Sequence, residues 1–321
     1  MDQYAVIAVG GNALIAEGQH GTIEEQVENA RRAAGHIASL VVRGGWRVVV
    51  THGNGPQVGF ILLRSETAAT HSFVPRLTLD MCGADSQGGL GYILTNSLSN
   101  ELALLGWRDK AVCVLTRTVV DAGDPAFRQP TKPIGGSYSA QAAAKLRTRP
   151  GWVLAEDAGR GYRRLVPSPR PLRIVESEAI RSLLDAGLVV VAAGGGGIPV
   201  VESQPGVYHG VEAVIDKDPA SALLASSLRV GLLIITTGVE RVAVRYRQPD
   251  QRFLDRVTLD EARSYLAAGE FAEGSMGPKM RAAVQFLERG GQEVIITSLD
   301  RLELAVAGSA GTHIGPARIL G

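Results

Sequence analysis

Lysine is rare in this chain, and its placement points to chemistry. Only five of the 33 basic residues are lysines, and three of these, Lys132, Lys217 and Lys279, lie in short segments rich in Gly, Pro and Asp. An ammonium group is a compact, strongly hydrated point charge, whereas the guanidinium of arginine is a wide planar fork. Nothing about the start of a helix favours a cation, because the helix dipole is positive there. These lysines therefore predict a site for a small, highly charged anion, and chemistry on a transferred phosphoryl group.

Two of the lysines belong to a local pattern that occurs three times: a strand, a loop of small residues, and a helix expected to begin with proline. The pattern occurs at residues 51–56 (THGNGP), 216–219 (DKDP) and 274–279 (GSMGPK). Proline at the first helical position sets the start of the helix, whose free amides and positive dipole end attract anions. After the first predicted strand, Gly10-Gly11 lets backbone amides approach an oxyanion, and Asn12 adds a side-chain donor.

Several of these residues also have a purely structural interpretation. Asp218 precedes a proline and could serve mainly as a helix N-cap. Gly194–Gly197 could be only a tight turn after a buried strand, and Asn54 could be present to tolerate a left-handed turn, although function is favoured for it. His52 is interpreted as a structural histidine and not as a base. Tyr246 could stack on a nucleobase, but a place in the core is favoured.

The sequence excludes several common kinds of site. No lysine follows a glycine, so the phosphate-binding P-loop motif is absent. Pro199 stands where the third glycine of a dinucleotide fingerprint would fall, which argues against a Rossmann oxidoreductase. No His/Cys cluster has the spacing of a zinc site, and no serine lies in a nucleophile elbow. The net charge of +1 gives no overall field that would attract nucleic acid.

Short apolar runs alternate with helical patterns, which predicts an α/β fold whose sheet is covered on both faces. The predicted strands are residues 4–9, 46–51, 111–120, 188–193, 232–236 and 293–297. One helix should begin after Thr22, where Glu25 completes a capping box, and should end at Gly44-Gly45. A second long helix is expected at residues 80–105.

A polar stretch rich in Pro and Gly interrupts this alternation. Residues 121–173 are expected to form a small insertion that protrudes from the sheet edge, with a short helix and then a hairpin at 152–166. Lys132 lies in the insertion in a loop-like setting, which makes the insertion a candidate lid. A change of pattern near residue 206 divides the chain into a first lobe, 1–205, and a nucleotide-binding lobe, 206–321.

The chain has no feature of a secreted or membrane protein. Cys82 and Cys113 lie far apart in apolar contexts, which indicates buried thiols in a reducing compartment. The first residues carry an acidic and not a basic start, unlike a signal peptide. No stretch of about 18 apolar residues is free of Gly, Pro and charge. We therefore expect a cytoplasmic protein that binds neither nucleic acid nor membrane.

Seven segments, taken in order, resemble the carbamate kinase family of the amino acid kinase superfamily. They are GGNAL (10–14), THGNGPQVG (51–59), KPIG (132–135), RRLVPSPRP (163–171), AAGGGGIPVV (192–201), EAVIDKDPAS (212–221) and GSMGPKM (274–280). Each is weak alone, but seven in sequence order over nearly the whole chain are specific.

This resemblance implies a three-layer αβα sandwich with a mainly parallel central sheet, two lobes, a small protruding subdomain, and a homodimer. It also implies reversible phosphoryl transfer between ATP and carbamate, with Mg²⁺ and no metal ligand assigned to the protein. The implied catalytic residues are Lys132, Lys217, Asp218 and Lys279, with Asp218 organising the lysines. The implied acceptor residues are Gly10, Gly11, Asn12, Gly53 and Asn54. The implied nucleotide residues are Gly195, Gly196, Asp216, Lys217, Tyr246, Met276 and Lys279.

Three alternatives remain open from the sequence. The nearest is another small-acid kinase of the same fold, acting on a carboxylate or a phosphonate. A kinase that synthesises carbamoyl phosphate would use the same residues in the opposite direction. A nucleotide sensor without activity belongs to a different class, but such a protein has no reason to keep three lysines and Asp218 together.

Overall fold

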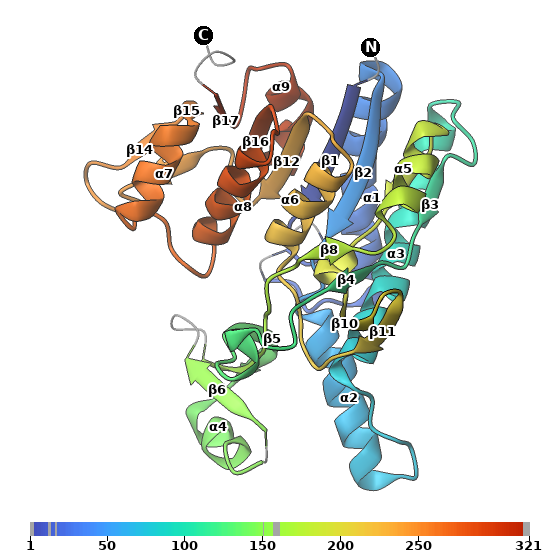
Figure 1. Ribbon diagram of the computed structural model, residues 1–321, viewed down its shortest axis with the longest axis vertical. Helices are drawn as coiled ribbons and strands as arrows, with labels where there is room; N and C mark the ends of the chain where they lie inside the picture. Colours follow the sequence, from blue (N-terminus) through green and yellow to red (C-terminus); the bar gives the residue numbers. More distant parts are fainter. Residues whose placement is uncertain (1–2, 12–13, 17, 150, 157–160, 317–321) are drawn as a thin grey trace.

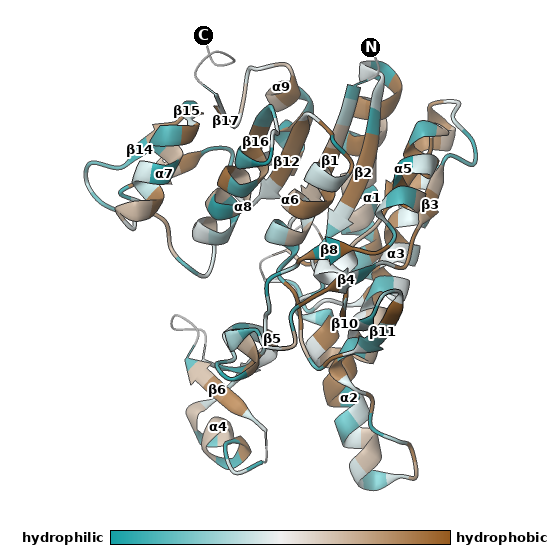
Figure 2. Cartoon of the chain, viewed as in Figure 1, coloured by the Kyte–Doolittle hydropathy of each residue, from teal (hydrophilic) through white to brown (hydrophobic). Residues whose placement is uncertain are grey.

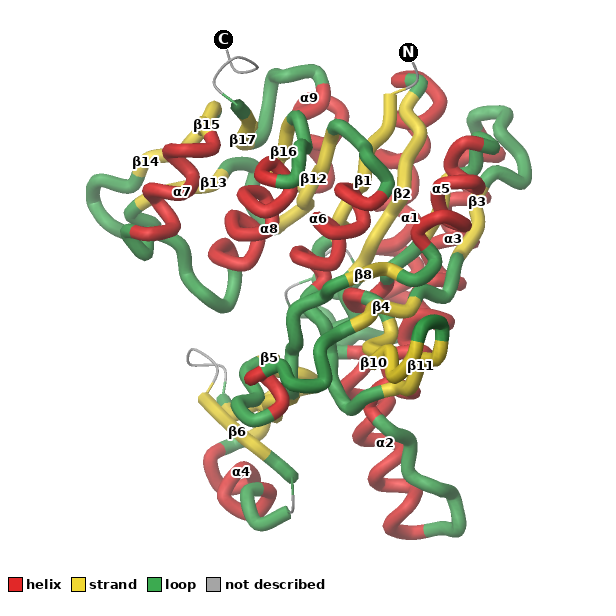
Figure 3. The backbone as a smooth tube through the Cα atoms, in the orientation of Figure 1, coloured by secondary structure: helices red, strands yellow, loops and turns green. Residues whose placement is uncertain are grey.

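The computed structural model describes residues 3–11, 14–16, 18–149, 151–156 and 161–316. Asn12 and most of the predicted hairpin turn at 157–161 lie outside the described residues. Strands and helices alternate along most of the chain (Figure 3). In the described part of the chain, no helix has the length and apolar character needed to cross a membrane.

One large sheet organises the molecule (Figure 1). Its strand order is β15-β17-β16-β12-β1-β2-β9-β3, and every neighbouring pair is parallel except β16 and β17. The strands are β1 (Gln3–Val9), β2 (Trp46–His52), β3 (Ala111–Cys113), β9 (Val189–Val191), β12 (Leu232–Thr237), β15 (Arg256–Thr258), β16 (Glu293–Ser298) and β17 (Thr312–Gly315). The sheet is thus mainly parallel, as predicted.

Helices cover both faces of this sheet, because successive side chains of each strand point to opposite sides. Ile7 and its alternate neighbours pack under α1 (Ile23–Gly44), α3 (Leu79–Leu104) and α9 (Leu302–Val306). Val6 and its alternate neighbours pack under α5 (Ser177–Asp185), α6 (Lys217–Ser227), α7 (Leu259–Ala267) and α8 (Met276–Glu288). Figure 2 shows apolar residues concentrated in the strands and hydrophilic residues on exposed helix surfaces such as that of α7. Each buried Val, Leu or Ile stabilises the fold by roughly 1.5–3 kcal/mol. The predicted three-layer αβα sandwich is confirmed.

The first helix has the boundaries that its sequence predicts. The Thr22 hydroxyl accepts a hydrogen bond from the Glu25 amide at 3.3 Å, and the Glu25 carboxylate accepts one from the Thr22 amide at 3.0 Å. Gly45 ends the helix with a φ of 69°, a left-handed conformation that suits glycine. The second long helix, α3, lies within one residue of its predicted bounds.

One predicted strand is wrong. Residues 111–120 do not form one strand but two, β3 and β4 (Arg117–Val119), which belong to different sheets. The Gln87 side chain of α3 accepts a hydrogen bond from the Thr116 amide at 2.9 Å and donates one to the Thr116 carbonyl at 3.0 Å. Because these backbone groups have side-chain partners, the chain can leave the large sheet there. Strand β4 joins β8 (Arg173–Ile174), β10 (Ile198–Gln204) and β11 (Val207–Gly210) in a four-stranded sheet.

The predicted insertion is a small subdomain that protrudes from the main body (Figure 1). It contains a short turn of helix (Pro125–Phe127), β5 (Lys132–Tyr138), α4 (Ala140–Leu146), β6 (Val153–Glu156) and β7 (Tyr162–Val166), with the strands in the order β5-β7-β6. The short helix and the hairpin are confirmed. The loop-like setting of Lys132 is wrong: it begins β5 and pairs with Val166 in β7. Beside the subdomain, α2 (Gln57–His71) also points away from the sheet.

A small two-stranded sheet completes the second half of the chain. It consists of β13 (Val242–Val244) and β14 (Arg252–Leu254), which run antiparallel and are joined by a loop that carries Tyr246. This sheet precedes β15 and α7, at the opposite end of the large sheet from β3 (Figure 1).

Candidate active site

The carboxyl ends of neighbouring parallel strands carry glycine-rich loops. The Gly10 amide after β1 donates a hydrogen bond to the Thr236 hydroxyl in β12 at 3.1 Å, and a Cβ on Gly10 would lie 2.8 Å from the Thr236 carbonyl oxygen. The loop after β2 lies beside Gly11, since a Cβ there would lie 3.7 Å from the Gly55 oxygen. Ligands of open α/β sheets bind at this edge.

The four-glycine segment Gly194–Gly197 has a steric reason for its composition. Gly195, Gly196 and Gly197 have φ values of 64°, 88° and 90°, which L side chains rarely adopt. A Cβ on Gly195 would overlap the Asn54 side chain, and one on Gly197 would overlap that of Thr118. Asn54 itself has no positive φ, so the left-handed interpretation of Asn54 is wrong.

Helix α6 begins differently from the sequence prediction. Asp216 is its N-cap, and its carboxylate accepts a hydrogen bond from the Asp218 amide at 3.1 Å. Asp218 is therefore the second helical residue, and its interpretation as the N-cap is wrong. Proline does not begin any of the three helices: Pro219 and Pro278 are third residues, and Pro56 precedes α2. A first-turn amide has no partner within its helix, so proline is tolerated there too.

Asp218 lies between two of the predicted lysines. Its side chain accepts hydrogen bonds from the Lys217 ammonium on one oxygen and from the Lys279 ammonium, at 2.9 Å, on the other. Asp218 is only 3% exposed. Lys217 comes from the start of α6 and Lys279 from the first turn of α8. A purely structural account of Asp218 would not require two cations.

The third predicted lysine reaches the same place from the protruding subdomain. The Lys132 ammonium donates a hydrogen bond to Asp216 at 2.8 Å. Three lysines from three separate segments thus meet two aspartates at the start of α6, so three positive and two negative charges leave one positive charge. A net positive charge at the carboxyl ends of parallel strands can attract a small anion such as a phosphoryl group.

Burial and charge act against each other in this cluster. Burial opposes ionisation of Asp218, but Lys217 and Lys279 outweigh it and hold the pKa of Asp218 well below its usual range. Asp216 is partly buried, which opposes its ionisation, yet Lys132 keeps its pKa lowered. Burial lowers the pKa of Lys217, which Asp218 partly offsets. Both carboxylates are therefore ionised at neutral pH.

His52, next to the cluster, is a structural residue. Its ring is buried, one ring nitrogen lies 2.8 Å from the Gly53 carbonyl oxygen, and a Cβ on Gly194 would overlap the ring. Burial lowers the pKa of His52 to about 4, with a smaller contribution from Lys217. The imidazole is therefore neutral near pH 7. The sequence interpretation of His52 as structural agrees with this packing.

The remaining predicted residues that the structure describes add no charged group to the lysine cluster. Tyr246 is 56% exposed, so the preference for a core position is wrong; the Arg247 guanidinium lies 5.4 Å from its ring centroid. Met276 begins α8 and packs partly against the core. Gly53 lies against the Lys217 stem, with its Cβ position 3.5 Å from Lys217 Cδ, and Gly196 packs against Ile215, just before Asp216.

Two hydroxyl groups that the sequence did not single out support the cluster. The Ser221 hydroxyl donates to the Lys217 carbonyl oxygen at 2.6 Å, and Thr51 and Ser221 share a hydrogen bond of 2.6 Å. Both side chains are fully buried. They connect the end of β2 with the first turn of α6. Both residues stand inside motifs that the sequence did identify, but nothing local shows that they meet.

Two carboxylates of the cluster would be available to a magnesium ion that arrives with a nucleotide. Among the described residues, no group of three His, Cys, Asp or Glu side chains could hold a metal, and Asp216 and Asp218 already pair with lysines. Mg²⁺ keeps several waters and is usually bound by substrate phosphates and one or two carboxylates. Asp216 and Asp218 are the carboxylates that the cluster offers.

Fold and site together indicate a phosphotransferase, and comparison with known proteins agrees. A model of the amino acid kinase family matches residues 3–298. The carbamate kinase of Thermococcus kodakarensis is 46% identical over 96% of this chain and 98% of its own length. The carbamate kinase-like protein YahI of Escherichia coli is also 46% identical, over 98% of this chain and 99% of its own. The carbamate kinase structure from Giardia lamblia bound to citric acid has a TM-score of 0.92 and 41% identity, and covers 98% of this chain and 99% of that one.

The chain therefore belongs to the amino acid kinase family. Within that family, its similarity over nearly the full length is to carbamate kinases.

Proposed function

We propose that this protein is a carbamate kinase, which transfers a phosphoryl group reversibly between ATP and carbamate. The observation that carries the proposal is the meeting of Lys132, Lys217 and Lys279 around Asp216 and Asp218. In one direction the bond between phosphorus and the carbamate oxygen of carbamoyl phosphate breaks, and a bond forms to a terminal oxygen of ADP. The products are ATP and carbamate, which decomposes to ammonia and carbon dioxide.

Such a transfer asks for little covalent work from the protein. Carbamate is already an anion, so no general base is needed, and rate comes from positioning and from neutralising charge. We assign Lys132 to carbamoyl phosphate, and Lys217 and Lys279 to the transferred phosphoryl group and the nucleotide phosphates. Asp218 holds the two latter ammonium groups in place. Mg²⁺, bound with the nucleotide, neutralises phosphate charge.

The two substrates are assigned to the two lobes. We place the acceptor in residues 1–205, at Gly10, Gly11, Asn12, Gly53 and Asn54, and ATP or ADP in residues 206–321. The contact of Gly53 with the Lys217 stem supports an acceptor position beside the phosphoryl site. The exposed ring of Tyr246 can stack on a base. Because Gly195 packs against Asn54, we move Gly195 from the nucleotide side to the acceptor side.

The direct test supplies purified protein with ADP, Mg²⁺ and carbamoyl phosphate and follows ATP. We expect ATP well above the non-enzymatic background, and loss of this signal when Lys217 is replaced by Ala. A parallel reaction with acetyl phosphate separates this activity from that of another small-acid kinase. No ATP from folded wild-type protein would contradict the proposal.

We further propose that the protein is a homodimer and acts in the cytoplasm, where Cys82 and Cys113 remain free thiols. On α3, Met81 and Tyr92 are 47% and 70% exposed. They lie 11 residues apart, about three helical turns, and therefore on one face. Light scattering should report twice the 33.8 kDa chain mass for wild type. Monomeric wild-type protein at micromolar concentration would contradict the dimer.

A further inference from the structure

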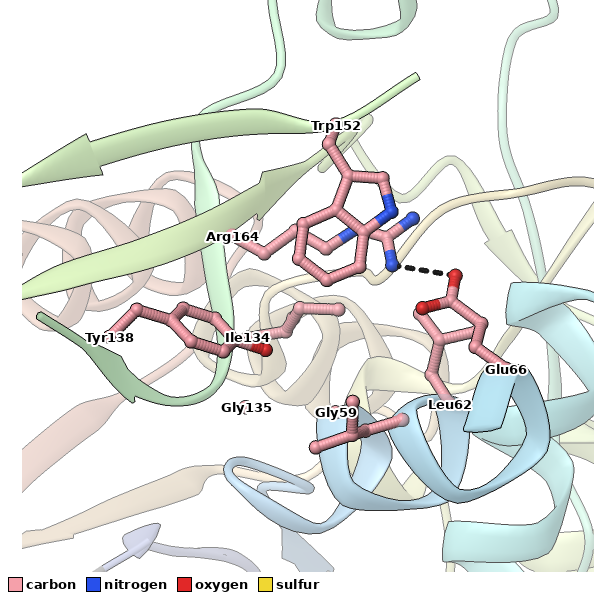
Figure 4. A pocket seen from close by; sticks show the side chains of 9 residues that line it. Gly59, Leu62, Glu66, Ile134, Gly135, Tyr138, Trp152 and Arg164 are labelled. Atoms are coloured by element: carbon pink, nitrogen blue, oxygen red, sulfur yellow. Dashed lines mark hydrogen bonds and ion pairs between the residues drawn. The ribbon is translucent and has the colours of Figure 1, made fainter. Parts of the chain in front are cut away.

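An ion pair between Glu66 and Arg164 connects α2 with the protruding subdomain. The guanidinium donates a hydrogen bond to the carboxylate at 2.9 Å, and the two side chains are only 13% and 12% exposed (Figure 4). Glu66 lies in α2 and Arg164 in β7, 98 positions apart in the sequence. None of the phosphate chemistry described above uses this pair.

The surroundings of the pair indicate that it orients the subdomain on α2 more than it stabilises the fold. The Arg164 guanidinium lies 4.3 Å from the ring centroid of Trp152, and Leu62 and Ile134 line the same small pocket. One carboxylate oxygen of Glu66 and the Nε of Arg164 are buried without a hydrogen-bond partner. A buried ion pair with incomplete hydrogen bonding is a poor source of stability compared with apolar packing. Such a pair can instead favour one docking position over its alternatives.

Each partner of this pair is coupled closely to a different side of the proposed phosphoryl site. Arg164 in β7 pairs with Ile134 in β5. Ile134 lies two residues after Lys132, so their side chains lie on the same face of β5. Glu66 belongs to α2, which follows directly after the loop that contains Gly53 and Asn54. A continuous path therefore runs from that loop through α2 and the ion pair to β5.

A second contact limits how the subdomain can sit on α2. The backbones of Gly59 in α2 and Gly135 in β5 touch, because a Cβ on Gly59 would overlap the backbone of Gly135. The glycines set the distance between the two elements, and the ion pair, about two helical turns further along α2, sets the angle. Without the pair, the sheet of the subdomain could pivot about this contact.

We propose that Glu66 and Arg164 are positioning residues, which set the place of the Lys132 ammonium relative to the acceptor loop. This inference rests on the proposed function, since it assigns Lys132 to the acceptor complex. The pair touches no substrate and acts only through Lys132. A displacement of about 1 Å at a reacting group can cost as much as a hundredfold in rate.

A double-mutant cycle tests the coupling. Arg164→Met should lower kcat/KM for carbamoyl phosphate by about tenfold or more, while the ADP dissociation constant stays unchanged. In a Lys132→Ala background, the same substitution should cause no further loss. The matched control is Arg173→Met, which removes the more exposed ion pair with Glu202 and should change nothing. An equal loss in both backgrounds, or none in the wild type, would overturn the proposal.

A second measurement does not depend on activity. Hydrogen exchange of the β5 amides should become faster in Arg164→Met than in wild type, with exchange in β1 and β2 unchanged. Glu66→Gln, which keeps the shape of the side chain, should give the same pattern if Arg164→Met folds poorly. Unchanged exchange in β5 would count against the positioning role even if wild-type protein made no ATP, so failure of the inference and failure of the proposed function are distinguishable.

Discussion

At the scale of single residues, we expect that arginine cannot replace Lys217 or Lys279. We predict that Lys217→Arg and Lys279→Arg each lose roughly a hundredfold or more in turnover, the effect of removing one preorganised donor aimed at transition-state charge. Each ammonium donates a hydrogen bond to a buried Asp218 oxygen, and a broad planar guanidinium does not reproduce the geometry of a compact ammonium. Steady-state ATP formation by each variant checks this. Near-normal rates in both would show that the lysines are peripheral.

Asparagine variants of Asp218 and Asp216 can separate a catalytic role of a carboxylate from its role as a helix cap. We predict that Asp218→Asn lowers turnover by at least a hundredfold, because the charge that holds Lys217 and Lys279 is lost. Asp216→Asn should keep the helix cap, since asparagine caps as well as aspartate. Its melting temperature should therefore stay near the wild-type value.

Turnover and thermal unfolding of both variants are the measurements. Wild-type turnover in a folded Asp218→Asn variant would show that Asp218 has a structural and not a catalytic role. A large fall in the melting temperature of Asp216→Asn would show that the carboxylate charge, and not the cap, stabilises the start of α6.

At the scale of elements, the starts of α6 and α8 fix the backbone positions of Lys217 and Lys279. In α6 and α8 the proline occupies the third helical position, so each helix begins two residues earlier, at Lys217 and at Met276. Lys217 is thereby held at the positive end of its own helix dipole, against the electrostatic preference. The neighbouring Asp218 offsets this cost.

The pairing of β16 with β17 in the large sheet can be tested by its dependence on pH. His313 in β17 lies 2.6 Å from the Glu293 carboxylate in β16, and this hydrogen bond raises the pKa of His313. A raised pKa means that its contribution to stability is complete below pH about 6.5 and is lost as pH rises through the folded-state value.

We therefore predict that His313→Gln destabilises the protein by about 1 kcal/mol more at pH 6 than at pH 9. Urea unfolding at the two pH values measures this difference. Glu293→Gln is the control, because it removes the partner and should remove most of the pH dependence. Equal destabilisation by His313→Gln at both pH values would contradict the assigned hydrogen bond.

At the scale of the whole molecule, the subdomain brings Lys132 to a cluster built by the rest of the chain. We predict that Lys132→Ala lowers turnover by roughly a hundredfold, while the ADP dissociation constant changes by less than about threefold, because ADP is assigned to the other lobe. Calorimetric titration with ADP and steady-state rates check both parts. Lys145→Ala, exposed on α4 of the same subdomain, should affect neither. A matched fall in ADP affinity and turnover would move Lys132 to the nucleotide site.

Closure of the subdomain would also have chemical value. Carbamoyl phosphate is hydrolytically fragile, and a lid that excludes water protects it during transfer. In the structure the Lys132 ammonium hydrogen-bonds Asp216, so a side chain of the subdomain reaches the start of α6. An arriving phosphoryl group must compete with Asp216 for this ammonium.

The sequence alone determined those features that depend on near neighbours. Apolar runs predicted β1, β2, β9, β12 and β16 of the large sheet, but not β15 or β17. Thr22 and Glu25 predicted the start of α1, and the polar stretch after residue 121 predicted the protruding subdomain. The rarity of lysine identified all three cations of the cluster. Each of these signals is local, because hydrophobic periodicity, helix capping and residue choice act over a few positions.

Only the tertiary structure decided where distant groups meet. Gln87 of α3 hydrogen-bonds Thr116 and so divides the predicted 111–120 strand, and the pairing of β5 with β7 placed Lys132 in a strand instead of a loop. The folded chain also exposed Tyr246 and brought Arg164 to Glu66. These outcomes depend on hydrogen bonds and packing between residues tens of positions apart, which leave no periodic pattern in the sequence.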